Sequence, residues 1–273
     1  MKIKLKNNNT RASKDIDKKK IKALTEELVD KISHYQHLIY AEKKHSVLIV
    51  FQGMDASGKD GVVKKVFSKC SAAGISVTSF KKPSDEEMAH DFLWRIHKVA
   101  PEKGQIKIFN RSHYEDILIQ RVHGWIDEDR VTRRIASINA FEETLIYDNN
   151  CTIIKVMLHI SPEKQLEKLL ERIEDPTKNW KHNDGDWIER KLWSEYMNAY
   201  EDMMNRCSVP WSVAPVDQRW YRDYMVAKII VDELEKLDLK LPILDEAAVK
   251  LKVGAPNHAK SESKSDDDEN KDD

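Results

Sequence analysis

One short stretch of the chain carries residue types that bind phosphate: VLIVFQGMDASGKDG, from Val47 to Gly61. Gly53, Gly58 and Lys59 fit the spacing G-x-x-x-x-G-K of the phosphate-binding loop (Walker A) that joins a strand to a helix. The glycines let the backbone turn tightly and aim its N–H groups at an anion, while the lysine reaches the outer phosphates. The stretch therefore predicts a phosphate site, the alternative being a glycine-rich turn that binds nothing.

Two carboxylates distinguish this loop from the common motif. Asp60 stands where a Ser or Thr hydroxyl usually binds magnesium, and Asp55 lies inside the loop. A carboxylate close to a bound phosphate is repelled unless a cation lies between them. Asp55 is therefore either a ligand of Mg2+, or of Mn2+ in its place, or a turn residue that accepts backbone hydrogen bonds. Asp60 is expected in the first turn of the following helix, where negative charge is stabilising.

A second β-rich run, from Ile75 to Phe80, ends in Lys81 and Lys82 before a proline. Lysines at the carboxyl end of a strand in an α/β sheet point towards the ligand crevice. We therefore expect Lys81 either to contact phosphate or to be a solvated loop charge.

A third run, from Ile106 to Phe109, leads into the polar segment NRSHYED. A strand at a second phosphate-binding segment usually ends in Asp, and here Asn110 takes that place. Arg111 can bind phosphate with two parallel hydrogen bonds. Glu115, one turn later, can restore the negative charge that a metal ion requires. The alternative for Glu115 is an acid at the start of a helix, favoured by the helix dipole.

A charged insert with a Pro-Thr break follows later in the chain: ERIEDPTKNWKHNDGDWIER, residues 171–190. In phosphotransferases, basic loops that close over phosphates exclude water and neutralise the charge of the transition state. We therefore expect a lid over about residues 171–195. Its candidate phosphate contacts, each alternatively a solvated surface charge, are Arg172, Lys178, Lys181 and Arg190.

Apolar periodicity predicts the elements that position these residues. Short apolar or β-rich runs predict strands at 47–51, 75–80, 106–109, 151–160 and 211–216. Helical spacing predicts helices at 21–41, from the loop to about 72, at 85–99, 117–148, 162–173, around 193–200 and at 221–237. Strands that alternate with helices indicate an α/β fold, with a parallel sheet covered by helices on both faces.

The composition fits one large α/β domain, expected over residues 21–250. Residues 1–20 are basic and predicted to form a flexible tail, and the acidic residues 255–273 are predicted to be disordered. Because the net charge is −1 and the middle of the chain is acidic, no nucleic-acid partner is expected. No apolar run reaches the roughly 18 residues that span a bilayer, so no membrane partner is expected. The polar N-terminus and three scattered cysteines are typical of a cytoplasmic protein.

Taken together, these segments resemble the family-2 polyphosphate kinases. The resembling stretches extend from about residue 20 to 240 and are VLIVFQGMDASGKDG, SFKKPS, IFNRSHYEDIL, ERIEDPTKNWK and WSVAPVDQRWYRD. The loop alone would also fit other P-loop kinases, whereas the motifs jointly are specific. The resemblance implies a P-loop kinase-like three-layer fold with a helical lid, and a homo-oligomer. It also implies reversible, Mg2+-dependent phosphoryl transfer between inorganic polyphosphate and nucleotides.

The resemblance also implies roles for single residues. Asp55 and Lys59 carry over as the metal-binding and phosphate-binding residues of the loop. Lys81 and Arg111 carry over as phosphate contacts, and Arg172 as a lid residue.

Two departures from the family pattern concern the acceptor nucleotide. Most members have Asp-Arg-Ser where this chain has Asn110-Arg111-Ser112, and Asn-Arg where it has Glu115-Asp116. The pattern resembles the subgroup that accepts both AMP and ADP, in which Glu115 offsets the charge missing at Asn110. The expected products are therefore ADP and ATP.

The expected reaction places polyphosphate along a channel lined by Lys81, Arg121 and cations of the lid. The end of the polyphosphate would meet the terminal phosphate of the nucleotide near Lys59 and Arg111. Two alternatives stay open. One is an ATP-dependent nucleotide kinase with the same loop and lid, and the other is a non-catalytic regulator that binds polyphosphate.

Overall fold

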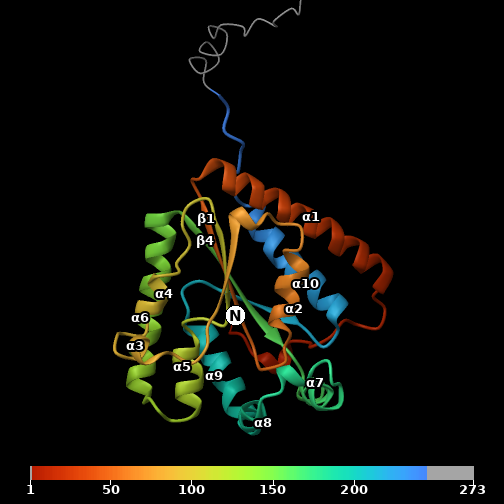
Figure 1. The fold of residues 1–273 in the computed structure, drawn as a ribbon, viewed down its shortest axis with the longest axis vertical. Helices are drawn as coiled ribbons and strands as arrows, with labels where there is room; N and C mark the ends of the chain where they lie inside the picture. The colour runs from red at the N-terminus through yellow and green to blue at the C-terminus, as the bar shows by residue number, and fades with distance from the viewer. Residues whose placement is uncertain (1, 245–273) are drawn as a thin grey trace, which may run out of the picture. The chain divides into compact units, whose positions relative to one another are not determined.

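Five parallel strands form the central sheet of the computed structural model, which describes residues 2–244 (Figure 1). The strand order is β2-β3-β1-β4-β5. The strands are β1 (Ser46–Gln52), β2 (Ile75–Ser79), β3 (Ile106–Asn110), β4 (Cys151–His159) and β5 (Trp211–Pro215). All seven residues of β1 are buried, as expected of a central strand in a sheet covered on both faces. The predicted α/β class and parallel sheet are confirmed. The predicted acidic tail, residues 255–273, lies outside the described residues.

Helices lie on both faces of the sheet (Figure 1). On one side, α1 (Lys18–Glu42), α2 (Lys59–Val66) and α10 (Arg219–Leu234) pack against one another. On the other side lie α5 (Glu115–Val122) and α6 (Glu128–Asn149). The remaining helices are α3 (Asp85–Met88), α4 (Trp94–His97), α7 (Pro162–Glu174), α8 (Asp184–Lys191) and α9 (Trp193–Arg206). Short 3-10 turns occur at Leu5–Asn7, Ala72–Gly74 and Asn179–Lys181.

Two predicted helices are each divided by a turn, so a single helix was the wrong prediction in both regions. The region 117–148 is divided into α5 and α6. Gly124, between the two helices, has a φ of 66°, and Asp127 caps α6 by accepting a hydrogen bond from the Arg130 N–H (2.8 Å). Region 85–99 holds only the short helices α3 and α4. Between them Asp91 accepts a hydrogen bond from the Leu93 N–H (2.9 Å), which stabilises a turn.

The N-terminal segment packs against α9. The Leu5 side chain is 2% exposed. The N–H groups of Ile3 and Leu5 donate to the side chains of Asn205 and Glu201 on α9, at 2.7 and 2.8 Å. The prediction of a flexible tail over residues 1–20 is therefore wrong for the segment before α1. The apolar side chains of Ile3 and Leu5, together with these hydrogen bonds, hold a segment whose composition is basic.

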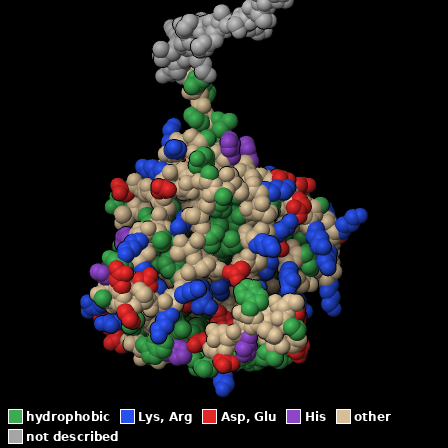
Figure 2. Space-filling model, viewed as in Figure 1, with side chains coloured by type: hydrophobic (Ala, Val, Ile, Leu, Met, Phe, Trp, Pro, Cys, Tyr) green, Lys and Arg blue, Asp and Glu red, His purple; other side chains and the backbone are tan. Residues whose placement is uncertain are grey.

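The charged residues of the chain are largely at its surface. Figure 2 shows basic and acidic side chains interspersed over the face that is also seen in Figure 1. Between residues 2 and 244, no helix has both the length and the apolar character that a membrane crossing requires.

A buried ion pair joins β4 to α6. Lys155 of β4 donates to Glu142 of α6 and to the Tyr114 hydroxyl, both at 2.7 Å, and that hydroxyl donates to Glu142 (2.7 Å). Burial opposes ionisation of Glu142, but the hydrogen bond with His113 and the Lys155 ammonium outweigh it and hold the pKa of Glu142 below its ordinary value. Because Tyr114 directly precedes α5, the network fixes the start of that helix.

Removing the buried cation should destabilise the fold. Lys155→Met keeps much of the side-chain volume but leaves the Glu142 carboxylate buried without its ammonium partner. We expect the free energy of unfolding, measured by urea denaturation, to fall by about 3–5 kcal/mol. The control is Lys228→Met, because Lys228 forms an exposed ion pair with Asp232 on α10. That change should cost at most about 1 kcal/mol. Equal losses in the two variants would contradict the role of the buried pair.

Candidate active site

The phosphate-binding loop lies between β1 and α2, at the carboxyl edge of the sheet. Gly53 and Gly58 have φ angles of 150° and 90°, which favour glycine. A Cβ atom at Gly53 would lie 2.6 Å from the carbonyl oxygen of Leu158 on β4, so glycine also permits the close approach to that strand. Gly58 directly precedes α2, whose first N–H groups and dipole favour an anion. The loop therefore has the backbone geometry of a phosphate cradle.

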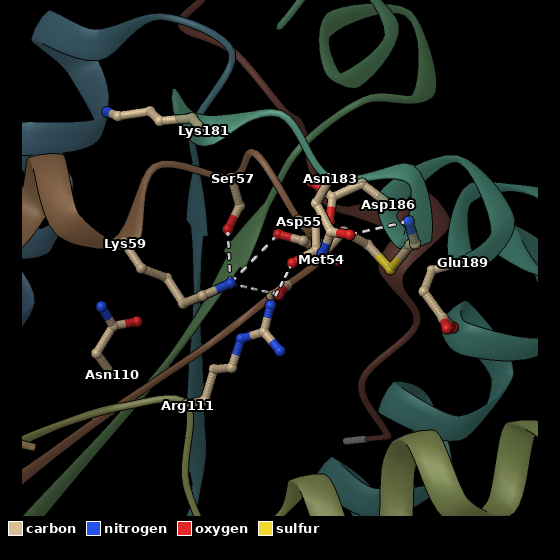
Figure 3. A network of polar contacts seen from close by, with 12 residues as sticks. Met54, Asp55, Ser57, Lys59, Asn110, Arg111, Lys181, Asn183, Asp186 and Glu189 are labelled. Atoms are coloured by element: carbon tan, nitrogen blue, oxygen red, sulfur yellow. Dashed lines mark hydrogen bonds and ion pairs between the residues drawn. The ribbon is translucent and has the colours of Figure 1, made fainter. Parts of the chain in front are cut away.

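The Lys59 side chain folds back over this loop (Figure 3). Its ammonium donates to the carbonyl oxygens of Gly53 (2.8 Å) and Met54 (3.3 Å). Burial lowers the pKa of Lys59 to about 8, and the charge of Arg111 adds to the shift while Asp55 opposes it. The ammonium is a cation with little solvation, so a bound phosphate would stabilise its charged form.

Arg111 connects the segment after β3 to the phosphate loop. Its guanidinium forms an ion pair with Asp55, as Figure 3 shows. The backbone of Arg111 is left-handed, with a φ of 62°, and its N–H donates to the Phe51 carbonyl of β1 (3.1 Å). Burial alone would lower the pKa of Arg111, but the carboxylates of Asp55 and Glu115 outweigh it and raise that pKa. The guanidinium is therefore held, charged, beside the loop.

Glu115 is the first residue of α5. Burial raises the pKa of Glu115, although the nearby cations Arg111 and Lys59 oppose the shift. The hydrogen-bonding groups of the Gln52 side-chain amide are satisfied when its nitrogen faces Glu115 and donates to Oε1 (3.0 Å). The structure thus brings together Asp55, Lys59, Arg111 and Glu115, the four residues predicted to be catalytic through their binding of phosphate or metal.

Three of these residues, Asp55, Arg111 and Glu115, line a cavity of about 160 Å³, and Lys59 donates to the carbonyl oxygens of Gly53 and Met54 in its wall. The phosphate loop and α5 form one wall, and α8, α9 and the residue before α8 form the other. The lining residues are Gly53, Met54, Asp55, Arg111, Glu115, Ile119, Asn183, Gly185, Asp186, Glu189, Tyr196 and Tyr200.

Sequence analysis missed the wall formed by α8 and α9. Tyr196 and Tyr200 are four residues apart on α9 and resemble core positions, and both are buried while also lining the cavity. Asp186 and Glu189 lie in the charged insert, where only cations suggested phosphate binding. Their spacing of three residues signals one helix face. Only the fold shows that this face meets Asp55.

Arg172 contributes to the site through Asp186. Its guanidinium pairs with the Asp186 carboxylate and also donates to the carbonyl oxygen of Lys181 (3.1 Å). Burial raises the pKa of Asp186, and the charge of Asp55 adds to that shift while Arg172 opposes it. Arg172 therefore positions one carboxylate of the cavity wall and does not itself line the cavity.

Two other predicted phosphate contacts lie away from this cavity. Arg121 donates to Glu128 (2.7 and 2.6 Å) and to Asp202 (2.8 Å), so its guanidinium joins α5 to α6 and α9. Lys81 is exposed after β2, and its ammonium has no hydrogen-bond or ion-pair partner among residues 2–244. Neither side chain lines the cavity.

Asn110 lies at the end of β3, next to the phosphate loop. Its side-chain nitrogen donates to Asp60 (2.6 Å), and the residue is buried. Asp60 is in the first turn of α2, where negative charge is favourable. Asn110 thus contacts the loop helix and not the cavity.

A larger cavity, of about 490 Å³, lies on a different face of α9. Leu5, His159 and Trp193 are among its lining residues, and it contains none of the four predicted catalytic residues. We therefore place the candidate active site in the smaller cavity, where the charged groups converge.

The oxygen donors of this cavity fit a divalent cation that is bound partly by substrate. Asp55 and Glu115 supply carboxylate oxygens, which Mg2+ prefers, and Mg2+ in phosphotransfer sites usually binds one or two carboxylates plus phosphates. In the described part of the chain, no group of three or more His, Cys, Asp or Glu side chains is arranged to hold a metal. A cation at this site would therefore need phosphate oxygens or water molecules as further ligands.

Comparisons with known proteins agree with these observations. A family model described as Polyphosphate kinase 2 (PPK2) matches residues 11–242. An AMP/ADP-polyphosphate phosphotransferase of Meiothermus ruber is 41% identical over 226 residues, which cover 82% of this chain and 84% of that protein. An ADP-polyphosphate phosphotransferase of Rhodopseudomonas palustris is 39% identical over 229 residues, covering 78% and 79%. The crystal structure of Polyphosphate Kinase 2 from Arthrobacter aurescens TC1 matches with a TM-score of 0.86 at 38% identity, covering 92% of each chain.

The lowered pKa of Lys59 should make phosphate binding depend on pH. With a pKa of about 8, Lys59 loses its proton as the pH rises through that value in the free protein. Affinity for long-chain polyphosphate should then fall by about tenfold for each pH unit above 8. The inner phosphates of such a chain stay ionised, so titration calorimetry between about pH 7 and 9.5 reports on the protein.

Lys59→Arg is the matched control for this measurement. A guanidinium keeps its proton over the whole range, so the loss of affinity above pH 8 should disappear. The same slope in both proteins would show that another group titrates.

Proposed function

The chain belongs to the polyphosphate kinase 2 family, and we propose that it transfers phosphoryl groups reversibly between inorganic polyphosphate and AMP or ADP, with Mg2+ as cofactor. The observation that carries this proposal is the convergence of Lys59, Arg111 and Asp55 at the cavity beside the phosphate loop. The relatives named AMP/ADP- and ADP-polyphosphate phosphotransferases support the donor and both acceptors. The proposal includes the cytoplasmic location and the homo-oligomer expected from the sequence.

In the proposed reaction, a terminal phosphate oxygen of the nucleotide attacks the terminal phosphorus of polyphosphate, and the bond from that phosphorus to its bridging oxygen breaks, so that polyphosphate shortened by one unit leaves. Such oxygens are already ionised near neutral pH, so neither a general base nor a covalent enzyme intermediate is required. Catalysis then depends on positioning and on charge neutralisation. Lys59 and Arg111 would neutralise the transferred group, and the ion pair with Asp55 keeps Arg111 beside the loop.

Asp55 and Glu115 would hold the divalent cation, since both line the cavity. When bound, Mg2+ neutralises phosphate oxygens of donor and acceptor that would otherwise repel each other. Gln52 orients the Glu115 carboxylate through its amide nitrogen. Lys59 would exchange the carbonyl oxygen of Gly53 for a phosphate oxygen when substrate arrives.

We also propose that residues 171–195 act as the lid. Within this segment, α8 already forms one wall of the cavity and so limits the access of water. Lys81, exposed beyond β2, stays the proposed contact for a more distant part of the polyphosphate chain. Arg121 is not assigned to that path, because Glu128 and Asp202 engage its guanidinium.

A donor and acceptor test decides between this function and its alternatives. Purified protein with Mg2+ is given AMP or ADP with long-chain polyphosphate, and separately AMP with ATP as donor, and the products are separated by ion-exchange chromatography. We expect ATP from either nucleotide with polyphosphate. Lys59→Ala should lower the rate about a thousandfold, because its charge contributes about 3–5 kcal/mol to the transition state.

Two other outcomes would contradict the proposal. Transfer only from ATP would indicate an ATP-dependent nucleotide kinase, and tight polyphosphate binding without transfer would indicate a regulator. If Lys59→Ala folds normally and keeps more than a tenth of the turnover, the role of Lys59 is wrong.

Glu115 should influence the choice between AMP and ADP. Glu115→Gln keeps the side-chain shape and removes the charge that offsets the missing carboxylate at Asn110. We expect both values of kcat/KM to fall, because Glu115 is a proposed ligand of the cation, and the value for AMP to fall at least about tenfold further than the value for ADP. A general loss of activity would lower both values of kcat/KM by the same factor, so the ratio of the two values serves as the control. An equal fall with both nucleotides would contradict this charge compensation.

A further inference from the structure

One buried side-chain amide joins the phosphate loop to the helix on the other side of the cavity. Gln165, in the first turns of α7, is fully buried. Its nitrogen donates to the carbonyl oxygen of Asp55 in the loop (3.1 Å). Its oxygen accepts a hydrogen bond from the Arg190 guanidinium of α8 (2.8 Å), which also donates to the carbonyl oxygen of Pro162 (2.8 Å).

Arg190 determines which way the Gln165 amide points. A guanidinium can only donate, so the amide must turn its oxygen towards Arg190, and its N–H then faces the Asp55 carbonyl. Arg190 forms no ion pair with a carboxylate among residues 2–244, and both of its acceptors are neutral. Its contacts therefore serve to order α7, α8 and the loop, and not to neutralise a charge.

The peptide that Gln165 holds belongs to an unusual turn of the loop. Ala56, which follows Asp55, has a φ of 64°, a conformation that residues other than glycine seldom adopt. The Ser57 N–H closes the turn by donating to the Met54 carbonyl (3.2 Å). The hydrogen bond from Gln165 stabilises this turn, from which the Asp55 side chain reaches Arg111.

The same contacts set the position of the opposite wall. Asp186 and Glu189, which line the cavity, are on α8 with Arg190. A shift of α8 would move Arg190 and release the Gln165 amide from its fixed orientation. The loop and α8 are therefore coupled through two side chains, neither of which lines the cavity.

We propose that Gln165 and Arg190 are positioning residues that couple the placement of α8 to the conformation of the phosphate loop. Through this coupling, Asp55 and Arg111 take their transfer geometry when α8 closes the cavity. The inference rests on the proposed phosphoryl transfer and adds two residues that act on it through the backbone of Asp55.

The kinetic test uses the full-length protein, with polyphosphate as donor and ADP as acceptor. Gln165→Met and Arg190→Met each break the coupling, so kcat should fall by about ten- to hundredfold, with KM for ADP changed by less than about threefold. The double variant should be no slower than the slower single variant, because both changes remove one connection. Multiplied losses in the double variant, or a kcat within about twofold of the wild type in either single variant, would overturn the proposal.

Two conservative variants separate the hydrogen bonds. Gln165→Glu can still accept from Arg190 but cannot donate to Asp55, so kcat should fall as in Gln165→Met. Arg190→Lys keeps a donor for Gln165 and should retain at least about a third of the wild-type kcat. These variants keep the test valid if a methionine variant fails to fold. Full activity of Gln165→Glu, or an Arg190→Lys protein as slow as Arg190→Met, would contradict the coupling.

Amide hydrogen exchange tests the coupling without turnover. Arg190→Met should lower protection in both residues 184–191 and residues 53–58, whereas Gln165→Glu should lower it only in the loop. Arg133→Met is the control, because the Arg133 side chain is 78% exposed and, among residues 2–244, forms an ion pair only with Asp129, and the change should affect neither exchange nor activity. Unchanged loop exchange in Arg190→Met would overturn the coupling. A wild-type protein that transfers no phosphate would overturn the proposed function instead, and the exchange data would still decide the coupling.

Discussion

The ion pair between Arg111 and Asp55 is the contact on which the rest of the site depends. It joins the loop after β1 to the segment after β3, and Arg111 forms it from a left-handed backbone conformation. Such a conformation persists only where its surroundings compensate its cost. Here the Arg111 N–H donates to the Phe51 carbonyl at the end of β1, and the carboxylates of Asp55 and Glu115 stabilise the half-buried guanidinium. Contacts within the protein therefore hold together the segments that follow β1 and β3.

The parallel sheet makes this contact possible. β3 lies directly beside β1, with Asn110 in register with Phe51, so both strands end at one edge and their following segments meet there. Beneath that edge, the Lys155–Glu142 pair holds the Tyr114 hydroxyl and with it the start of α5, where Glu115 lies. A buried ion pair is weak evidence for stability by itself. Its position here instead determines where a cavity-lining carboxylate is placed.

Local sequence patterns were sufficient to predict the strands and the loop between β1 and α2, because apolar runs bounded by glycine or polar residues indicate buried strands and the turns that end them. They were insufficient where a role depends on a distant partner. Arg121 and Arg172 look alike in the sequence, yet one pairs with Asp202, which is 81 residues away, and the other with Asp186 of the cavity wall. Gln165 contacts a residue 110 positions earlier, and no periodicity marks it. Leu5 similarly lies between Lys4 and Lys6, in a segment whose composition is basic.

Carboxylates outnumber cationic groups among the side chains that line the cavity, which supports the proposal of a divalent cation there. Its walls carry four carboxylates, two from the loop and α5 and two from α8, against the single guanidinium of Arg111. Lys59 adds a second positive charge beside Gly53, but burial weakens its hold on the proton. The raised pKa values of Glu115 and Asp186 reflect how poorly these carboxylates are solvated. Bringing two phosphate chains to such walls would be repulsive without further positive charge. The proposed divalent cation would supply that charge, with Asp55 and Glu115 as its carboxylate ligands.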